Sequence, residues 1–187
     1  HVVCRDGCSV VRVNKQGGGV DVFDLQPDQW DFVPGGHDVA AIPLNVNTGM
    51  HEFSFVPLSF FLLKEHVVNL EIGPGDNAFM SGRFIDHDGG DTNKPALRFG
   101  HISMMPEYIR QFNGSRQETY CIDIHSRTGF SGSPVFGFRT PGEDLSSPGS
   151  IDTTESGKNF VGLLGIHYGQ FPEYWRVVNG ATIPEGE

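Results

Sequence analysis

The stretch GFSGSPVFGF, residues 129–138, joins a glycine-flanked serine to a run of alternating apolar residues. Glycine adopts positive φ easily and serine forms local hydrogen bonds, so both residues are common in turns. The alternation that follows Ser131 is typical of a β-strand. On these grounds alone the stretch is a tight turn that leads into a strand. It differs from the nucleophile elbow of α/β-hydrolases, which requires glycine at the position of Ser133.

Short β-like runs dominate the rest of the chain. They are rich in Val, Ile, Phe and Tyr, and clusters of Gly, Pro, Asp and Asn divide them. The predicted strands are 9–13, 20–24, 38–44, 52–56, 78–85, 96–103, 118–124, 133–138 and 159–168. Residues 105–112 are predicted to form a brief helix. The apolar pattern of residues 57–70 does not distinguish a helix from a strand. Residues 86–94 and 139–158 are predicted to be polar loops. This pattern predicts an all-β fold, as a sandwich or barrel.

Composition excludes several classes of function. The chain has 187 residues and a formal net charge of -10 at pH 7, which argues against nucleic acid and anionic membrane surfaces as partners. No apolar run approaches the ~20 residues of a membrane span. The HExxH motif is absent and residues 86–94 depart from the calcium-loop pattern, so we expect no metal and no cofactor. Cys4, Cys8 and Cys121 are expected to include at most one disulfide, and Cys121 to be a small buried residue.

A serine hydroxyl is a weak nucleophile near neutral pH unless a base lies within hydrogen-bond reach. That base is normally a histidine held by a carboxylate, and backbone N–H groups must face the developing oxyanion. Upstream of Ser131, the stretch GGHDVAAIPL (35–44) places Asp38 at the start of an apolar strand, and HVV opens the chain at His1. The order His1, Asp38, Ser131 is the order of the triad in the chymotrypsin class.

Taken together, these motifs resemble those of trypsin-like serine proteases of the bacterial or viral type. GFSGSP resembles the nucleophile motif G-[DN]-S-G-G-P, HDVAAIPL resembles the D-[IVL]-A-[VL]-[LI] strand, and HVV resembles the end of the histidine motif. Residues 160–169 resemble the strand that lines the specificity pocket, while 72–84 and 97–103 resemble the opening strands of the second barrel. Phe130 and Ser133 depart from the usual Asp or Asn and from the usual Gly.

The resemblance implies a chymotrypsin-like double β-barrel. Its first barrel is expected to be incomplete, because the strands that precede the histidine in the family are absent from this sequence. The implied division is a remaining part of the first barrel at 1–56, a linker at 57–70 and a second barrel at 71–187. A half barrel leaves an open strand edge and exposed apolar surface, so we expect the 187-residue piece alone to be inactive or to aggregate.

The resemblance also implies a role for each site residue. Ser131 is the expected nucleophile, His1 the base and Asp38 the residue that orients the base. The backbone N–H groups of Gly129 and Ser131 are the expected oxyanion hole. His37 is a less favoured alternative base, because adjacent strand residues point to opposite faces. The remaining histidines upstream of the pocket segment are expected to be surface or edge residues: His51, His66, His87 and His101.

Three further residues are expected to line the substrate pocket. His125 and Ser126 precede the nucleophile, and His167 lies on the strand that follows it. A histidine N–H and a serine hydroxyl can bind a carboxylate or amide oxygen, whereas a lysine or arginine side chain finds no acidic partner among these three residues. We therefore expect cleavage after Glu or Gln. The alternative is an apolar pocket in which His167 is a packed strand residue.

The sequence thus predicts a serine endopeptidase that acts on peptide or protein substrates through an acyl-enzyme. One alternative is a pseudoprotease or peptide-binding module that keeps the fold without catalysis. Another is a viral processing protease with the same chemistry. No nucleic acid, metal ion or cofactor enters any of these hypotheses.

Overall fold

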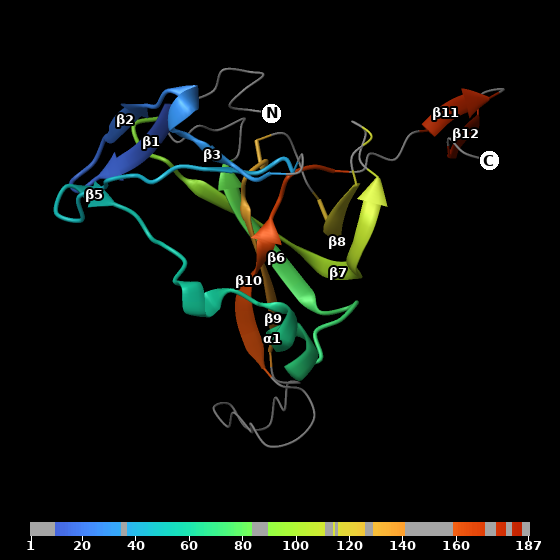
Figure 1. The fold of residues 1–187 in the computed structure, drawn as a ribbon. Coiled ribbons are helices and arrows are strands. Elements are labelled where there is room, and N and C mark those ends of the chain that lie inside the picture. Colours follow the sequence, from blue (N-terminus) through green and yellow to red (C-terminus); the bar gives the residue numbers. More distant parts are fainter. Residues whose placement is uncertain are drawn as a thin grey trace, which may run out of the picture.

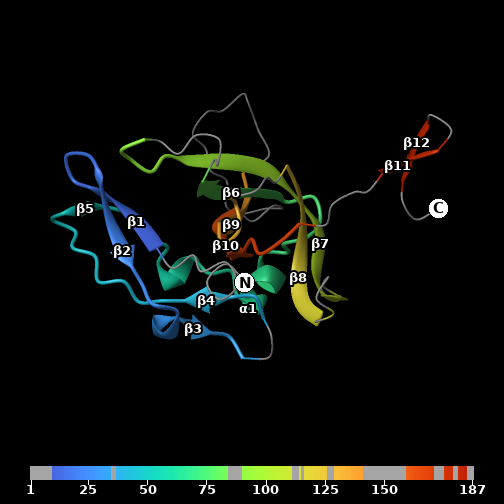
Figure 2. The same ribbon diagram turned by 90° about the horizontal axis from the view of Figure 1, so that it is seen from above.

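The computed structural model describes residues 10–34, 37–83, 90–110, 114, 116–125, 129–140, 159–170, 175–178 and 181–184. These residues are predominantly β, which confirms the predicted class. They contain two main antiparallel sheets, one of three strands and one of five, and two small two-stranded sheets. Figure 1 shows the three-stranded sheet beside the five-stranded sheet, and Figure 2 shows the same arrangement from above.

The first sheet has the strand order β2-β1-β5. Its strands are β1 (Val10–Lys15), β2 (Val20–Asp24) and β5 (His51–Glu52). The turn between β1 and β2 contains three successive glycines at 17–19, all with positive φ. Side chains disfavour that backbone conformation, so the glycine run explains why the chain reverses tightly here.

Two predicted strands are much shorter than expected. Of 38–44 only β4 (Ala40–Ala41) is a strand, paired with β3 (Asp31–Phe32). Of 52–56 only Glu52, in β5, is a strand residue. Prolines follow both strands, at Pro43 and Pro57. Proline has no N–H to donate to a ladder, which fits the end of β4 two residues before Pro43, whereas Pro57 lies five residues after β5 and does not account for its end.

The segment between the two main sheets is partly helical. Residues 57–70, which fit either period, form a 3-10 turn at Leu58–Phe60 and helix α1 at Lys64–Asn69. Leu62 N–H donates to Leu163 O at 2.9 Å, and Phe61 forms a parallel bridge with Leu163. These contacts bind the segment to the second sheet ahead of α1 (Figure 1).

The second sheet has the strand order β10-β9-β6-β7-β8. Its strands are β6 (Asn77–Arg83), β7 (Pro95–Arg110), β8 (Arg116–Ile124), β9 (Pro134–Arg139) and β10 (Phe160–Ile166). All four strand pairs are antiparallel. Neither main sheet closes on itself. A separate hairpin of β11 (Trp175–Val178) and β12 (Ala181–Pro184) follows.

Strand β7 corrects the helix predicted at 105–112. Residues 105–110 continue the strand, with Glu107 opposite Thr119 and Tyr108 opposite Glu118. The register shifts between Ile102 and Met104 and again before Glu107, so Pro106 falls in an irregular part of the ladder where its missing N–H is tolerated. Pairing with β8 outweighs the local helical pattern.

The buried core lies mostly in the second sheet. Met80 of β6 and Val135 of β9 pack with Phe130, which is completely buried, and Ile122 and Ile124 of β8 pack against this cluster. Phe79 stacks on Phe136 with ring centroids 4.9 Å apart. In the first sheet Val13 is the buried apolar residue among those described. The serine turn therefore lies on the better packed sheet.

Arg139 of β9 forms an ion pair with Asp76 and also bonds to the chain just after α1. The Arg139 guanidinium donates to both carboxylate oxygens of Asp76 at 2.6 Å, and to Leu70 O and Glu71 O at 2.9 Å. Glu71 has a φ of 52°, a left-handed conformation that is unfavourable for a residue with a side chain. Arg139 thus bonds to the carbonyl groups of Leu70 and Glu71, the two residues that follow α1, and so fixes the strained Glu71 against β9.

The two sheets are connected by a polar contact between β1 and the chain before β7. Asn93 N–H donates to Asn14 Oδ1 at 2.6 Å, and Asn14 Nδ2 donates back to Asn93 O at 3.1 Å. Asn93 Nδ2 also donates to Arg12 O at 3.0 Å. These bonds fix the start of β7 against the first sheet.

Candidate active site

The turn at 129–133 presents Ser131 at the surface. Phe130 O accepts a hydrogen bond from Ser133 N–H at 3.0 Å, which closes a four-residue turn with Ser131 and Gly132 at its centre. Gly132 has a φ of +84°, the value that a type II turn requires at its third residue. Gly129 has a φ of 99°. Gly129 and Gly132, which flank Phe130 and Ser131, are therefore needed for this backbone path. Ser131 is exposed between the two glycines.

Phe130 holds the turn on the sheet. Its side chain has no exposed surface, and the Arg98 guanidinium lies 5.6 Å from its ring centroid. A side chain at Gly82 of β6 would collide with Ser133 Oγ and would approach Phe130 Cδ1 to 2.7 Å. The two departures from the family motif, Phe130 and Ser133, are thus both buried packing residues beneath the exposed Ser131.

The expected oxyanion hole consists of two backbone N–H groups of the serine turn. Within the described part of the chain, no acceptor takes a hydrogen bond from the backbone N–H of Gly129 or of Ser131. Such N–H groups at an exposed turn can donate to an anionic oxygen. No hydrogen bond links Ser131 Oγ to a histidine among the described residues.

His167 lies directly against this turn. Its backbone N–H donates to Ser133 O at 2.9 Å, and its carbonyl accepts from Gly132 N–H at 2.7 Å. Its ring Nδ1 lies 3.2 Å from Phe130 O. Because a carbonyl oxygen only accepts, Nδ1 carries the proton in this hydrogen bond. Burial lowers the pKa of His167, and the bond to Phe130 only partly opposes that shift, so the neutral ring is favoured near pH 7.

The residue beyond His167 ties the same segment to β8. Tyr168 hydroxyl lies 2.7 Å from Thr119 Oγ1, and Thr119 donates to Gln117 O at 3.1 Å. Thr119 therefore accepts from Tyr168. Thr119 and Gln117 are both buried. The segment that follows β10 is thus held on one side by the serine turn and on the other by β8.

Asp38 lies in the first part of the chain, just before β4. Asp38 is half-buried and immediately precedes β4, in the part of the chain that pairs with β3. His37 beside it is exposed. His1, the expected base, and Ser126, an expected pocket residue, lie outside the described residues. His125 is exposed at the end of β8.

Cys121 has the environment of a packing residue. It lies in β8, half-buried, and is a free thiol. Burial raises the pKa of the Cys121 thiol, which disfavours the reactive thiolate. Cys4 and Cys8 lie outside the described residues, as does His87.

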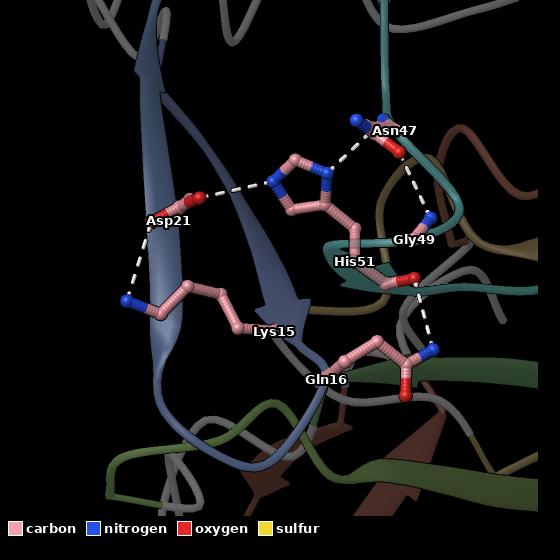
Figure 3. Close-up of polar contacts among 6 residues, drawn as sticks. All are labelled: Lys15, Gln16, Asp21, Asn47, Gly49 and His51. Atoms are coloured by element: carbon pink, nitrogen blue, oxygen red, sulfur yellow. Dashed lines mark hydrogen bonds and ion pairs between the residues drawn. The ribbon is translucent and has the colours of Figure 1, made fainter.

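His51, expected to be a surface or edge residue, lies in the edge strand β5 and is buried. Its side chain is 7% exposed and lies between the first two strands and the loop before β5 (Figure 3). Asn47 N–H donates to His51 Nδ1 at 3.1 Å, so Nδ1 is unprotonated and Nε2–H donates to Asp21 Oδ2 at 3.0 Å. This bond, with help from Lys15 3.5 Å away, holds the pKa of Asp21 below its usual value.

The hydrogen bond between His51 and Asp21 was not predicted, because the two residues are thirty positions apart and belong to no motif. A weak signal exists in Asn47-Thr48-Gly49, because Asn47 Oδ1 accepts from Gly49 N–H at 2.9 Å and forms a local turn (Figure 3). Of the other histidines expected at the surface, His101 is exposed and His66 is half-buried on α1.

Among the described residues no group of His, Cys, Asp and Glu is arranged to hold a metal ion. None of the described helices has the length and apolarity to cross a membrane. Comparison of the chain with protein-family models, with curated proteins and with solved structures gives no match.

Proposed function

We propose that this chain is a serine endopeptidase of the chymotrypsin class, with Ser131 as its nucleophile. The observation that carries the proposal is the turn at 129–133. It combines an exposed serine, two glycines with positive φ and two backbone N–H groups that have no acceptor among the described residues. Acyl transfer through a serine requires this combination of an accessible hydroxyl and preorganised donors.

In this proposal the other roles follow the order of the motifs. His1 removes the proton from Ser131 Oγ as it attacks the peptide carbonyl, and Asp38 orients His1. The tetrahedral oxyanion accepts hydrogen bonds from the N–H groups of Gly129 and Ser131. The amine leaves with the proton from His1, and water then hydrolyses the acyl-enzyme by the reverse roles. The fold that belongs to this chemistry is the double β-barrel, of which the two open sheets would be parts.

The direct test is peptide hydrolysis by Ser131→Ala in the intact parent protein, because the 187-residue piece alone is expected to be inactive or to aggregate. We expect activity to fall by about four orders of magnitude or more, because the nucleophile is lost while the turn remains. Ser133→Ala is the matched control, since Ser133 is buried two residues away and its hydroxyl has no hydrogen bond among the described residues. Thermal unfolding of both variants should match the parent protein. Equal hydrolysis by Ser131→Ala and the parent would remove Ser131 from the mechanism.

For specificity we propose cleavage after Gln or Glu, with His167 as the residue that reads the side chain. In the neutral His167 ring, Nδ1–H donates to Phe130 O, so Nε2 carries no proton. An Nε2 atom that faces the substrate would accept a hydrogen bond from the N–H of a glutamine amide. A glutamate carboxylate needs a donor at Nε2, which only the imidazolium provides. Burial lowers the pKa of His167 below 6.5, so this cation forms on the acid side of that value.

Paired peptides that differ only in Gln or Glu at the cleaved residue test this proposal at pH 7.5 and 5.5. We expect Gln to be preferred at pH 7.5, and the Glu to Gln ratio of kcat/KM to rise several-fold at pH 5.5, where free glutamate near pKa 4.3 stays mostly ionised. A dominant signal after Lys or Arg would contradict the pocket assignment. So would a pH-independent ratio.

A further inference from the structure

The peptide unit between Phe130 and Ser131 carries two groups that matter for the proposed chemistry. One is Phe130 C=O, and the other is Ser131 N–H, an expected oxyanion-hole donor. A trans peptide is planar and holds these two groups on opposite sides. Any contact that fixes the direction of Phe130 C=O therefore fixes the direction of Ser131 N–H as well.

Two donors meet on Phe130 O. Ser133 N–H donates at 3.0 Å, which is the hydrogen bond of the turn itself. His167 Nδ1–H donates at 3.2 Å, from the segment after β10, more than thirty residues away in sequence. The first bond exists in any such turn, whereas the second comes from a side chain. Bonds accepted by a carbonyl also polarise its peptide unit and strengthen its N–H as a donor.

The His167 ring is itself held in place. Its backbone N–H bonds to Ser133 O and its carbonyl to Gly132 N–H, so the second half of the turn is paired with one residue. Tyr168 beside it bonds to buried Thr119 of β8. The ring therefore reaches Phe130 O from a fixed backbone, and burial keeps it neutral with its proton at Nδ1.

From this geometry we infer that His167 is a positioning residue, whose Nδ1–H orients the Phe130–Ser131 peptide and directs Ser131 N–H toward the oxyanion. The inference rests on the proposed function, and it adds a role that is independent of the substrate side chain. A residue that only read the substrate would affect selectivity alone. A residue that sets the oxyanion donor affects every reaction of Ser131.

The test uses diisopropyl fluorophosphate, a small reagent without an amino-acid side chain. Ser131 Oγ attacks phosphorus, the O–P bond forms, fluoride leaves with the P–F electrons, and the hydroxyl proton passes to the base. The phosphoryl oxygen occupies the oxyanion position. The second-order rate constant of this reaction is measured for the parent protein and for His167→Asn, His167→Gln and His167→Ala, with the labelled residue located by mass spectrometry.

The two amide variants separate hydrogen bonding from packing. Asn places an N–H donor where His has Nδ1, whereas Gln is closer to His in volume but moves its donor one carbon further out. We expect His167→Asn to react within about threefold of the parent. His167→Gln and His167→Ala should react roughly 10- to 100-fold more slowly, the loss expected when a reacting group is displaced by about an ångström.

The outcomes distinguish the two proposals. If the folded parent protein is not labelled at Ser131, the proposed function is wrong. If the parent is labelled and all three variants react at its rate, Ser131 remains the nucleophile and the positioning role of His167 is wrong. If Gln restores the rate better than Asn, His167 acts through packing, which also overturns the inference.

Discussion

The two main sheets are stabilised in different ways. The five-stranded sheet buries Met80, Phe130 and Val135 together in an apolar cluster. The three-stranded sheet has Val13 as its buried apolar residue among those described, and it also buries the polar side chain of His51, which bonds to Asp21. The serine turn lies on the apolar cluster of the five-stranded sheet, whereas Asp38 precedes β4 of a separate two-stranded sheet. The comparison shows that the turn proposed to carry the nucleophile is supported by apolar burial, whereas the three-stranded sheet depends more on polar contacts.

The largest effect on stability is expected from truncating a side chain of the apolar cluster. Phe130→Ala should lower the free energy of unfolding by about 3–5 kcal/mol, because a completely buried ring is lost and leaves a cavity. Chemical denaturation measures the change. Phe55→Ala is the control, since Phe55 is 77% exposed and its loss should change stability by less than about 0.5 kcal/mol. Similar losses in both variants would mean that the cluster does not support the turn.

The second prediction concerns the ion pair between Asp76 and Arg139. Its side chains are 10% and 23% exposed, so Asp76→Asn should lower the free energy of unfolding by roughly 2–3 kcal/mol, near the lower end for buried pairs. Glu118→Gln is the matched control, because its Lys64 partner is 87% exposed and that pair is screened by solvent. Glu118→Gln should leave stability unchanged. An equal loss in both variants would contradict the difference in burial.

This ion pair also predicts a pH dependence. Partial burial tends to raise the pKa of Asp76, but hydrogen bonds from Arg139 and Gly73 and the Arg139 charge outweigh it, so the pKa lies below its usual value. A depressed pKa in the folded state stabilises the protein above the unfolded value of about 3.9. That contribution disappears as the pH falls through the folded pKa. The stability gap between the parent protein and Asp76→Asn should therefore shrink below about pH 4.

The smallest effect tests the polar contacts of the three-stranded sheet. His51→Ala should lower the free energy of unfolding by about 1–2 kcal/mol, because Asn47 N–H and Asp21 lose a buried partner. Lys15→Ala removes the other, more exposed contact of Asp21 and should have no measurable effect. Hydrogen exchange of the β1 and β5 amides should accelerate in His51→Ala alone. Unchanged exchange there would mean that His51 does not hold this sheet together.

Much of the fold was predictable from local patterns. Alternating Val, Ile and Phe predicted strands that correspond to β1, β2, β6, β8, β9 and β10. Residues 105–110 were wrongly predicted as helix, because the ladder with β8 is a long-range interaction that no local pattern contains. Closure of the two barrels was not confirmed, since neither sheet closes.

The candidate site divides in the same way. Gly129 and Gly132 have the positive φ values that a serine held out of a turn requires, and the sequence indicated that turn directly. The bond from His167 to Phe130 O could not be predicted, because it depends on how β10 lies beside the turn. The contact between His51 and Asp21 could not be predicted for a similar reason, since the two residues are thirty positions apart. The catalytic, oxyanion-hole and pocket roles assigned from the sequence all stay predictions, and His1 and Ser126 lie outside the described residues.

Covalent labelling of the parent protein with a fluorophosphonate, followed by peptide mapping, shows whether Ser131 is the nucleophile. We expect one modified residue in the folded protein, Ser131, and no modification of Ser131→Ala. Labelling should be unchanged in Ser133→Ala, because Ser133 is buried. A folded parent protein that takes up no label, or that carries its label on another residue and keeps it in Ser131→Ala, would exclude Ser131 as the nucleophile.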